Sequence, residues 1–82
     1  MIKKNKLNAF EMFEKLDYKQ TKTENCVYYT DGFTTIEFIF YEKTYVAYLY
    51  DIMSDRYMAI SLDMDIFRAI YMQLYELGWL ND

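Results

Sequence analysis

Residues 26–52 read CVYYTDGFTTIEFIFYEKTYVAYLYDI and contain the clearest structural pattern in the sequence. Apolar and polar residues alternate with a period of two on either side of Asp31-Gly32, a dipeptide typical of a type I′ β-hairpin turn. Glu42-Lys43 is a second and weaker candidate for a two-residue loop, because neither residue favours positive φ. The pattern predicts three antiparallel strands, over Cys26–Thr30, Phe33–Tyr41 and Thr44–Ile52.

The two predicted hairpins agree on which side chains share a face of the sheet. The first loop sets Val27 opposite Ile36, and the second sets Phe38 opposite Ala47. Both registers place one set of residues on the predicted core face: Val27, Tyr29, Ile36, Phe38, Phe40, Ala47 and Leu49. The opposite face then carries Tyr28, Thr35, Glu37, Ile39, Tyr41, Val46, Tyr48 and Tyr50.

The segment before these strands has the pattern of a capped amphipathic helix. Asn8 can cap it, and Glu11 three residues on can complete a capping box. The helix is predicted to run to about Asp17, with an apolar stripe of Ala9, Met12, Phe13 and Leu16. The polar segment Tyr18–Asn25 predicts at most a short edge strand.

A fourth strand and a second helix are predicted after the meander. The strand covers Tyr57–Ile60, and the helix starts near Ser61 or Asp63 and ends at Gly78, a typical C-terminal glycine. Its buried stripe is predicted to be Ile66, Phe67, Ile70, Tyr71, Leu74 and Leu77. The whole chain, residues 1–82, is thus predicted to be one α+β domain, with two helices packed on a meander of three to four antiparallel strands.

The composition argues against most kinds of chemistry. The chain has no histidine and a single cysteine, Cys26, so neither a histidine-activated nucleophile nor a zinc site can be built. Caps and turns account for the four neighbouring aspartates Asp51, Asp55, Asp63 and Asp65. We therefore expect no catalytic residues, no enzyme activity, no metal and no cofactor. The net charge of −4 argues against direct nucleic-acid binding.

The location of the protein follows from what the chain lacks. No segment reaches the length of about 18–20 apolar residues needed to span a membrane, and the N-terminus has no signal-peptide pattern. A single unpaired cysteine is typical of a reducing compartment. A cytoplasmic protein is expected.

Aromatic residues are too many for so small a core: ten tyrosines, six phenylalanines and one tryptophan in 82 residues. If the first helix covered the outer face of the sheet, its tyrosines would be buried in a three-layer fold. If both helices lie on the core face, the outer tyrosines form an interface for a target or for self-association. The second interpretation is favoured, because the first helix is too short to cover four strands.

A protein-binding role is therefore the leading hypothesis. The proposed contact residues are Tyr28, Ile39, Tyr41, Tyr48 and Tyr50 on the sheet, and Met72, Tyr75 and Trp79 on a second stripe of the last helix. The acidic loop Asp51–Asp55 would steer the protein to a basic partner. Two alternatives remain: a homo-oligomer, such as a homodimer, and a sponge for a small nucleotide signal bound by tyrosine with Arg56 or Arg68.

The arrangement resembles small uncharacterised phage and prophage accessory proteins of Gram-positive bacteria. The residues that carry the resemblance are the first helix, Asn8–Leu16, the acidic aromatic meander, and the final segment Leu74–Trp79. Asp17 stands where a glycine would be expected to end the first helix. The resemblance implies a protein that blocks a host protein by steric occlusion, for example a CRISPR-type defence nuclease or a regulatory protein.

Overall fold

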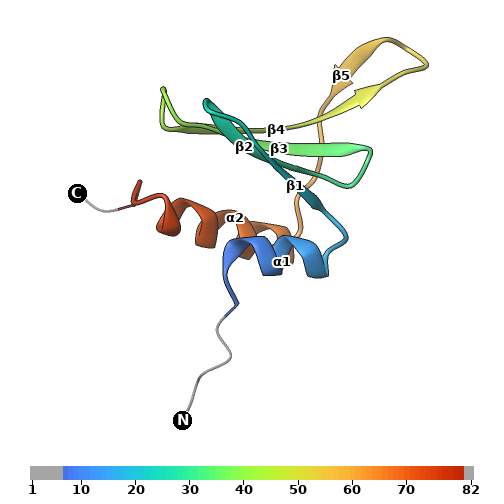
Figure 1. The fold of residues 1–82 in the computed structure, drawn as a ribbon. Helices are drawn as coiled ribbons and strands as arrows, with labels where there is room; N and C mark the ends of the chain where they lie inside the picture. Colours follow the sequence, from blue (N-terminus) through green and yellow to red (C-terminus); the bar gives the residue numbers. More distant parts are fainter. Residues whose placement is uncertain (1–6, 81–82) are drawn as a thin grey trace.

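The computed structural model describes residues 7–80, which form two helices and one five-stranded antiparallel sheet (Figure 1). The elements are α1 (Ala9–Lys15), β1 (Lys19–Lys22), β2 (Cys26–Thr30), β3 (Thr34–Ile39), β4 (Thr44–Asp51), β5 (Arg56–Met58) and α2 (Met64–Glu76). The strands lie in the sheet in chain order, as a meander. The predicted α+β layout is confirmed, and the sheet gains a strand because the polar segment after α1 forms β1.

Both helices lie on the same side of the sheet, and no helix or strand of residues 7–80 covers the other side (Figure 1). The contacts agree with this view. Phe13 of α1 stacks on Tyr29 of β2 with ring centroids 3.9 Å apart, and Gln73 of α2 accepts a hydrogen bond from the same tyrosine. The predicted placement of both helices on the core face is therefore confirmed, and the three-layer arrangement is wrong.

Local signals explain where α1 begins and ends. Asn8 Oδ1 accepts the Glu11 N–H at 2.8 Å, and the Asn8 N–H donates to the Glu11 carboxylate at 3.0 Å, so the predicted capping box is present. The helix ends at Lys15, earlier than predicted, because Asp17 adopts a left-handed φ of 69°. The Tyr18 N–H then donates to the Phe13 carbonyl at 3.0 Å, which closes a Schellman motif.

The sheet register differs from the predicted one by two residues in each of the first two predicted hairpins. Val27 pairs with Phe38 rather than Ile36, and Phe38 pairs with Tyr45 rather than Ala47. The loops are longer than two residues and cover 31–33 and 40–43. In the first, Asp31 Oδ1 accepts the backbone N–H groups of Phe33, the last loop residue, and Thr34, the first residue of β3, which fixes a wider turn. A shift of two residues keeps every side chain on its predicted face.

The core lies between the inner face of the sheet and the two helices. Its buried residues are Phe13, Tyr18, Val27, Tyr29, Ile36, Phe38, Ala69 and Ile70. Phe38 meets Phe13 and Tyr29 edge-on, at centroid distances of 6.5 Å and 6.2 Å. Burying each such aromatic or branched side chain contributes about 1.5–3 kcal/mol. Partly buried Phe40, Ala47 and Trp79 pack around this cluster.

The predicted buried stripe of α2 is confirmed at Ile66, Ile70, Leu74 and Leu77, which lie in or pack against the core, and is rotated at the remaining positions. Ala69 and Gln73 are buried with Ile70, whereas Phe67 and Tyr71 are 49% and 53% exposed. The reason is a polar contact that no local pattern contains: the Tyr29 hydroxyl donates to Gln73 Oε1 at 2.5 Å and accepts from Gln20 Nε2 at 2.9 Å. Because this amide must face the sheet, the rings of Phe67 and Tyr71 turn toward solvent.

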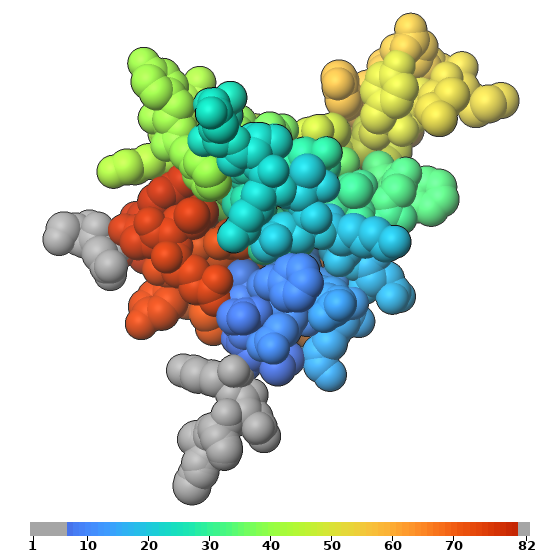
Figure 2. Space-filling model, viewed as in Figure 1, coloured from blue at the N-terminus to red at the C-terminus, as the bar shows by residue number. Residues whose placement is uncertain are grey.

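The β4–β5 hairpin stands away from the rest of the molecule (Figure 2). β5 covers Arg56–Met58, somewhat earlier in the chain than the predicted strand Tyr57–Ile60, and pairs with the last three residues of β4. The loop between them, residues 52–55, ends with Asp55 at a positive φ of 56°. Its Ile52 and Met53 side chains are almost fully exposed.

Candidate partner-binding surface

We call the sheet face opposite the helices the outer face. Side chains of residues paired across antiparallel strands point to the same side, so the register defines its rows. One row crosses β2, β3 and β4 and consists of Tyr28, Glu37 and Val46. In a second row Thr35 of β3 pairs with Tyr48 of β4, and in a third Tyr50 of β4 pairs with Tyr57 of β5. Ile39 ends the face near the loop 40–43. None of the elements in residues 7–80 covers these side chains (Figure 1).

Three tyrosines form a cluster on the outer face. The ring of Tyr57 meets those of Tyr48 and Tyr50 edge-on, each at a centroid distance of 5.2 Å. Partial burial and the nearby Glu37 raise the pKa of Tyr48. The Tyr50 hydroxyl donates to the Asp55 carboxylate, and this bond raises the pKa of Tyr50. Tyr48 and Tyr50 therefore remain neutral near pH 7.

Glu37 brings a carboxylate into the middle of this apolar surface. It is half-buried between its cross-strand partners Tyr28 and Val46. No lysine or arginine among residues 7–80 forms a salt bridge with it. A carboxylate in such surroundings favours a cationic group, so a partner with an arginine or lysine at this point would complement the face.

The structure places the predicted sheet residues as follows. Tyr28, Ile39, Tyr48 and Tyr50 lie together on the outer face. Tyr41 does not, because β3 ends at Ile39 and Tyr41 lies in the loop 40–43 with 94% of its surface exposed.

The predicted acidic loop has structural bonds of its own. Asp51 accepts the Met53 N–H at 3.1 Å and the Ser54 hydroxyl at 2.7 Å, and Asp55 accepts from Tyr50. Asp63 caps α2 by accepting the Ile66 N–H at 2.9 Å. The four neighbouring aspartates thus lie in two groups, at the hairpin tip and at the start of α2.

The predicted residues of α2 do not form one surface. Met72 lies in an apolar hollow of about 370 Å³ between the helices, with Met12, Phe67, Arg68 and Tyr71. Tyr75 is exposed. Trp79 follows the end of the helix at Gly78, whose φ is 79°, and packs against the core. This helix surface lies on the other side of the molecule from the outer face.

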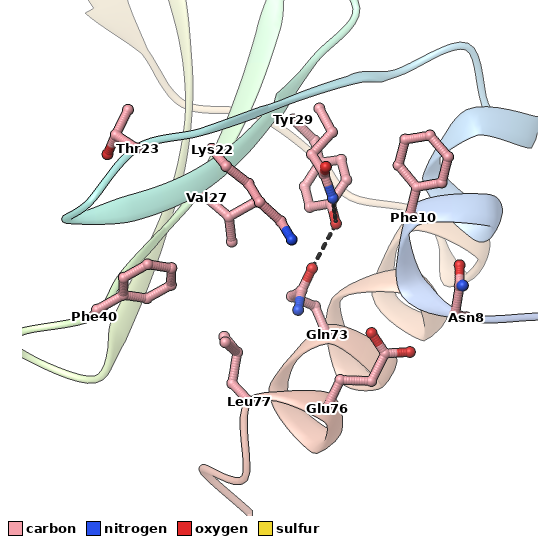
Figure 3. Close-up of a pocket in the computed structure, with 11 residues that line it drawn as sticks. Asn8, Phe10, Lys22, Thr23, Val27, Tyr29, Phe40, Gln73, Glu76 and Leu77 are labelled. Carbon is pink, nitrogen blue, oxygen red and sulfur yellow. Dashed lines mark hydrogen bonds between the residues drawn. The ribbon is translucent and has the colours of Figure 1, made fainter.

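A second hollow, of about 500 Å³, opens on the inner face between β1, β2 and the helices (Figure 3). Besides the buried Tyr29, its polar lining residues are Asn8, Gln20, Lys22, Thr23, Gln73 and Glu76. Glu76 is engaged, because it accepts the Ala9 N–H at 2.9 Å. Neither Arg56 nor Arg68, the residues predicted to hold a nucleotide, lines this hollow.

The structure also bears on the single cysteine, on metal binding and on membrane-spanning helices. Cys26 is buried beside Thr23, with its sulfur 3.5 Å from the threonine hydroxyl. Among residues 7–80, no three histidine, cysteine, aspartate or glutamate side chains lie close enough together to hold a metal ion. In the same part of the chain, no helix has the length and apolar character needed to cross a membrane.

Two side chains of the outer face, Tyr57 and Glu37, were not among the predicted contact residues. Tyr57 belongs to a strand whose register was not predicted, and Glu37 was placed on the face without a role. The alternation of Tyr48 and Tyr50, continued across the next turn, could have indicated Tyr57. A search for relatives adds no further residues: no family model, curated protein or solved structure matches the chain.

Proposed function

We propose that the protein is a non-enzymatic protein-binding module and that its outer face is the binding surface. The observation that carries the proposal is the uncovered tyrosine cluster of Tyr48, Tyr50 and Tyr57, which continues onto the projecting β4–β5 hairpin. Proteins that act as monomers rarely leave a contiguous aromatic patch in water.

The residue types on this face suit a protein partner. Tyrosine offers a large rigid ring together with a hydroxyl, and it is enriched among the residues that dominate binding energies. The edge-to-face contacts hold the three rings in place before binding, which reduces the entropy lost on association. Glu37 adds a charge that favours a basic group on the partner.

The outer face is a better candidate than the hollow between the helices. The hollow around Met72 is lined by five residues, and one of them, Arg68, forms a salt bridge with Asp65 at 3.1 Å. The outer face extends across β2, β3, β4 and β5 without a covering element. A flat surface of this kind fits a folded protein.

The biological setting that we propose is inhibition of a bacterial defence or regulatory protein by steric occlusion. Its support is the resemblance to phage accessory proteins together with the open outer face. Binding alone would suffice for this mechanism, because a small protein seated on a functional surface excludes the natural ligand. A phage-infection assay in a host that carries a defence system tests the setting, and unchanged plaque numbers on expression of the protein would contradict it.

Paired variants test the binding surface itself. The outer-face variant combines Tyr48→Ser with Tyr57→Ser, and the matched helix variant combines Phe67→Ser with Tyr71→Ser. Affinity capture from bacterial lysate identifies a partner for the wild type, and calorimetry measures its affinity. We expect the outer-face variant to lose about 2 kcal/mol or more of binding free energy, roughly thirtyfold in Kd.

Two controls make the comparison decisive. Circular dichroism establishes that both variants remain folded, and the helix variant should bind within about threefold of the wild type. Loss of binding in the helix variant, with retention in the outer-face variant, would move the site to α2. A wild type that captures no protein at stoichiometric yield would contradict the proposed function.

A further inference from the structure

The two edges of the sheet are protected to different degrees. β1, at one edge, has a lysine at each end, Lys19 and Lys22, and charged side chains of this kind discourage pairing with other strands. At the other edge, β5 pairs only with Leu49–Asp51. The preceding five residues of β4, Thr44–Tyr48, have β3 on one side and, within residues 7–80, no strand on the other.

The direction of the backbone groups on this open edge can be deduced. The Phe40 N–H donates to the Asn25 carbonyl at 3.0 Å, so Phe40 and alternate residues before it in β3 turn their backbone groups toward β2. The intervening residues of β3 face β4, where their partners are Thr44, Val46 and Tyr48. Tyr45 and Ala47 therefore direct their N–H and C=O groups away from β3, at the open edge.

From this geometry we infer that β4 pairs antiparallel with β4 of a second copy of the chain, along Thr44–Tyr48 and around a two-fold axis at Val46. In this register Tyr45 pairs with Ala47 of the other copy, and Ala47 pairs with Tyr45 of the other copy. Each of these two pairs exchanges two hydrogen bonds, so all four groups that β4 directs outward are satisfied. The two sheets become one.

Two features of the segment favour a second copy as the occupant. Thr44–Tyr48 reads TYVAY and has no charged residue, so the net charge of −4 on each copy creates no repulsion within the paired segment. The register sets the large ring of Tyr45, which is 40% exposed, beside the small Ala47. A register centred on Tyr45 would instead oppose two tyrosine rings.

The length of the open segment of β4 also suits pairing with a second copy. The open segment has five residues, with β5 beyond one end and the loop 40–43 at the other. In the two-fold arrangement the β5 hairpin of each copy lies past the end of the paired segment, beside the loop where the other chain turns away. A longer strand from an unrelated protein would meet β5. The inference stands independently of the proposed function, because the edge of β4 is distinct from its outer face.

Cysteine crosslinking tests the register. Val46 lies opposite itself in a pair without mutual hydrogen bonds, where Cα atoms are about 4.5 Å apart, within the range that a disulfide needs. Thr44 lies opposite Tyr48, so the two Thr44 Cα atoms are separated by roughly 14 Å. Under oxidised glutathione the Val46→Cys variant should form a covalent dimer, and the Thr44→Cys variant should form one only when mixed with Tyr48→Cys. The wild type, with its buried Cys26, is the control.

Sedimentation measures the non-covalent dimer. The wild type should associate as its concentration rises. Val46→Lys, which opposes two like charges at the axis, should raise the dimer dissociation constant at least about tenfold, whereas Thr21→Lys on β1 should leave it unchanged. A monomeric wild type at every concentration overturns the inference. So does equal crosslinking of the Val46→Cys and Thr44→Cys variants, or a monomer that instead binds an unrelated extended peptide at β4.

Discussion

The inner and outer faces of the sheet are made of the same kinds of residue, yet they have different surroundings. Tyr29, Ile36 and Phe38 on the inner face are completely buried, while Tyr50 and Tyr57 on the outer face are 41% and 67% exposed. Both sets are apolar and aromatic. Burial is decided by the two helices, which lie on one side, rather than by the chemistry of the strands.

The hydroxyl groups sharpen the contrast. On the inner face, the Tyr29 hydroxyl is fully used inside the protein, by Gln73 and Gln20. On the outer face, the Tyr50 hydroxyl bonds an exposed aspartate at the hairpin tip, where a partner could compete for it. A tyrosine can therefore serve either as a core residue or as a contact residue, and its partners distinguish the two roles.

The largest effect should come from emptying the inner face. Phe38→Ala removes a fully buried ring and leaves a cavity, so we expect a loss of about 3–5 kcal/mol in the free energy of unfolding. Urea denaturation followed by circular dichroism measures it. Val46→Ala on the outer face is the matched control and should lose about 1 kcal/mol or less. Equal losses in the two variants would contradict the difference between the faces.

A smaller effect should follow from removing one oxygen atom. Tyr29→Phe keeps the ring but leaves buried Gln73 without its donor, so we expect a loss of about 1–3 kcal/mol in stability. Tyr45→Phe, at a half-exposed position on the same side of the sheet, should change stability by about 0.5 kcal/mol at most. A fully stable Tyr29→Phe protein would show that the hydroxyl does not fix the orientation of α2.

The outer cluster should affect stability still less. Tyr57→Ala removes two edge-to-face contacts at an exposed position, and we expect a loss of about 1 kcal/mol in the free energy of unfolding. Thermal denaturation measures this change in stability, and calorimetry measures the affinity of the same variant for a captured partner. A loss as large as that of Phe38→Ala would mean that the outer face is structural rather than a binding surface.

The smallest effect on stability near neutral pH should come from the titration of the buried tyrosines. Burial, reinforced by Glu76, raises the pKa of Tyr29 above 10.0, and burial likewise raises that of Tyr18. The unfolded chain therefore loses these protons first. The stabilising contribution is complete below about pH 10 and falls as the pH rises through the folded-state pKa values.

Urea midpoints measured between about pH 8 and pH 11 test this titration, and the Tyr29→Phe variant should show a shallower decline. An identical decline in wild type and variant would show that Tyr29 takes no part in it.

The sequence predicted the faces of the sheet better than its pairings. A strand period of two separates Tyr28 from Tyr29 whatever the register, and both errors in register were of two residues, which preserves the faces. The error arose because Asp31 can bond forward to Thr34 and widen its turn. A dipeptide signal does not contain that information.

The helices illustrate the opposite case. Asn8 and Glu11 lie three residues apart, so the start of α1 was predictable from a local pattern. The rotation of α2 was not, because apolar residues occur around most of its circumference and the deciding contact joins Gln73 to a tyrosine 44 residues away. The placement of Tyr28, Ile39, Tyr48 and Tyr50 on the outer face was predictable from the strand period. The placement of Tyr41 was wrong, because β3 ends at Ile39 and Tyr41 lies in the loop that follows.

The bond between Tyr29 and Gln73 also has a consequence for synthesis on the ribosome. Chains emerge with the N-terminus first, and α2 follows all five strands. Until α2 has left the exit tunnel, the inner aromatic face lacks the cover that Ala69, Ile70 and Gln73 provide. We expect the nascent meander to remain open and to bind chaperones during elongation, and the domain to close only after translation has passed α2.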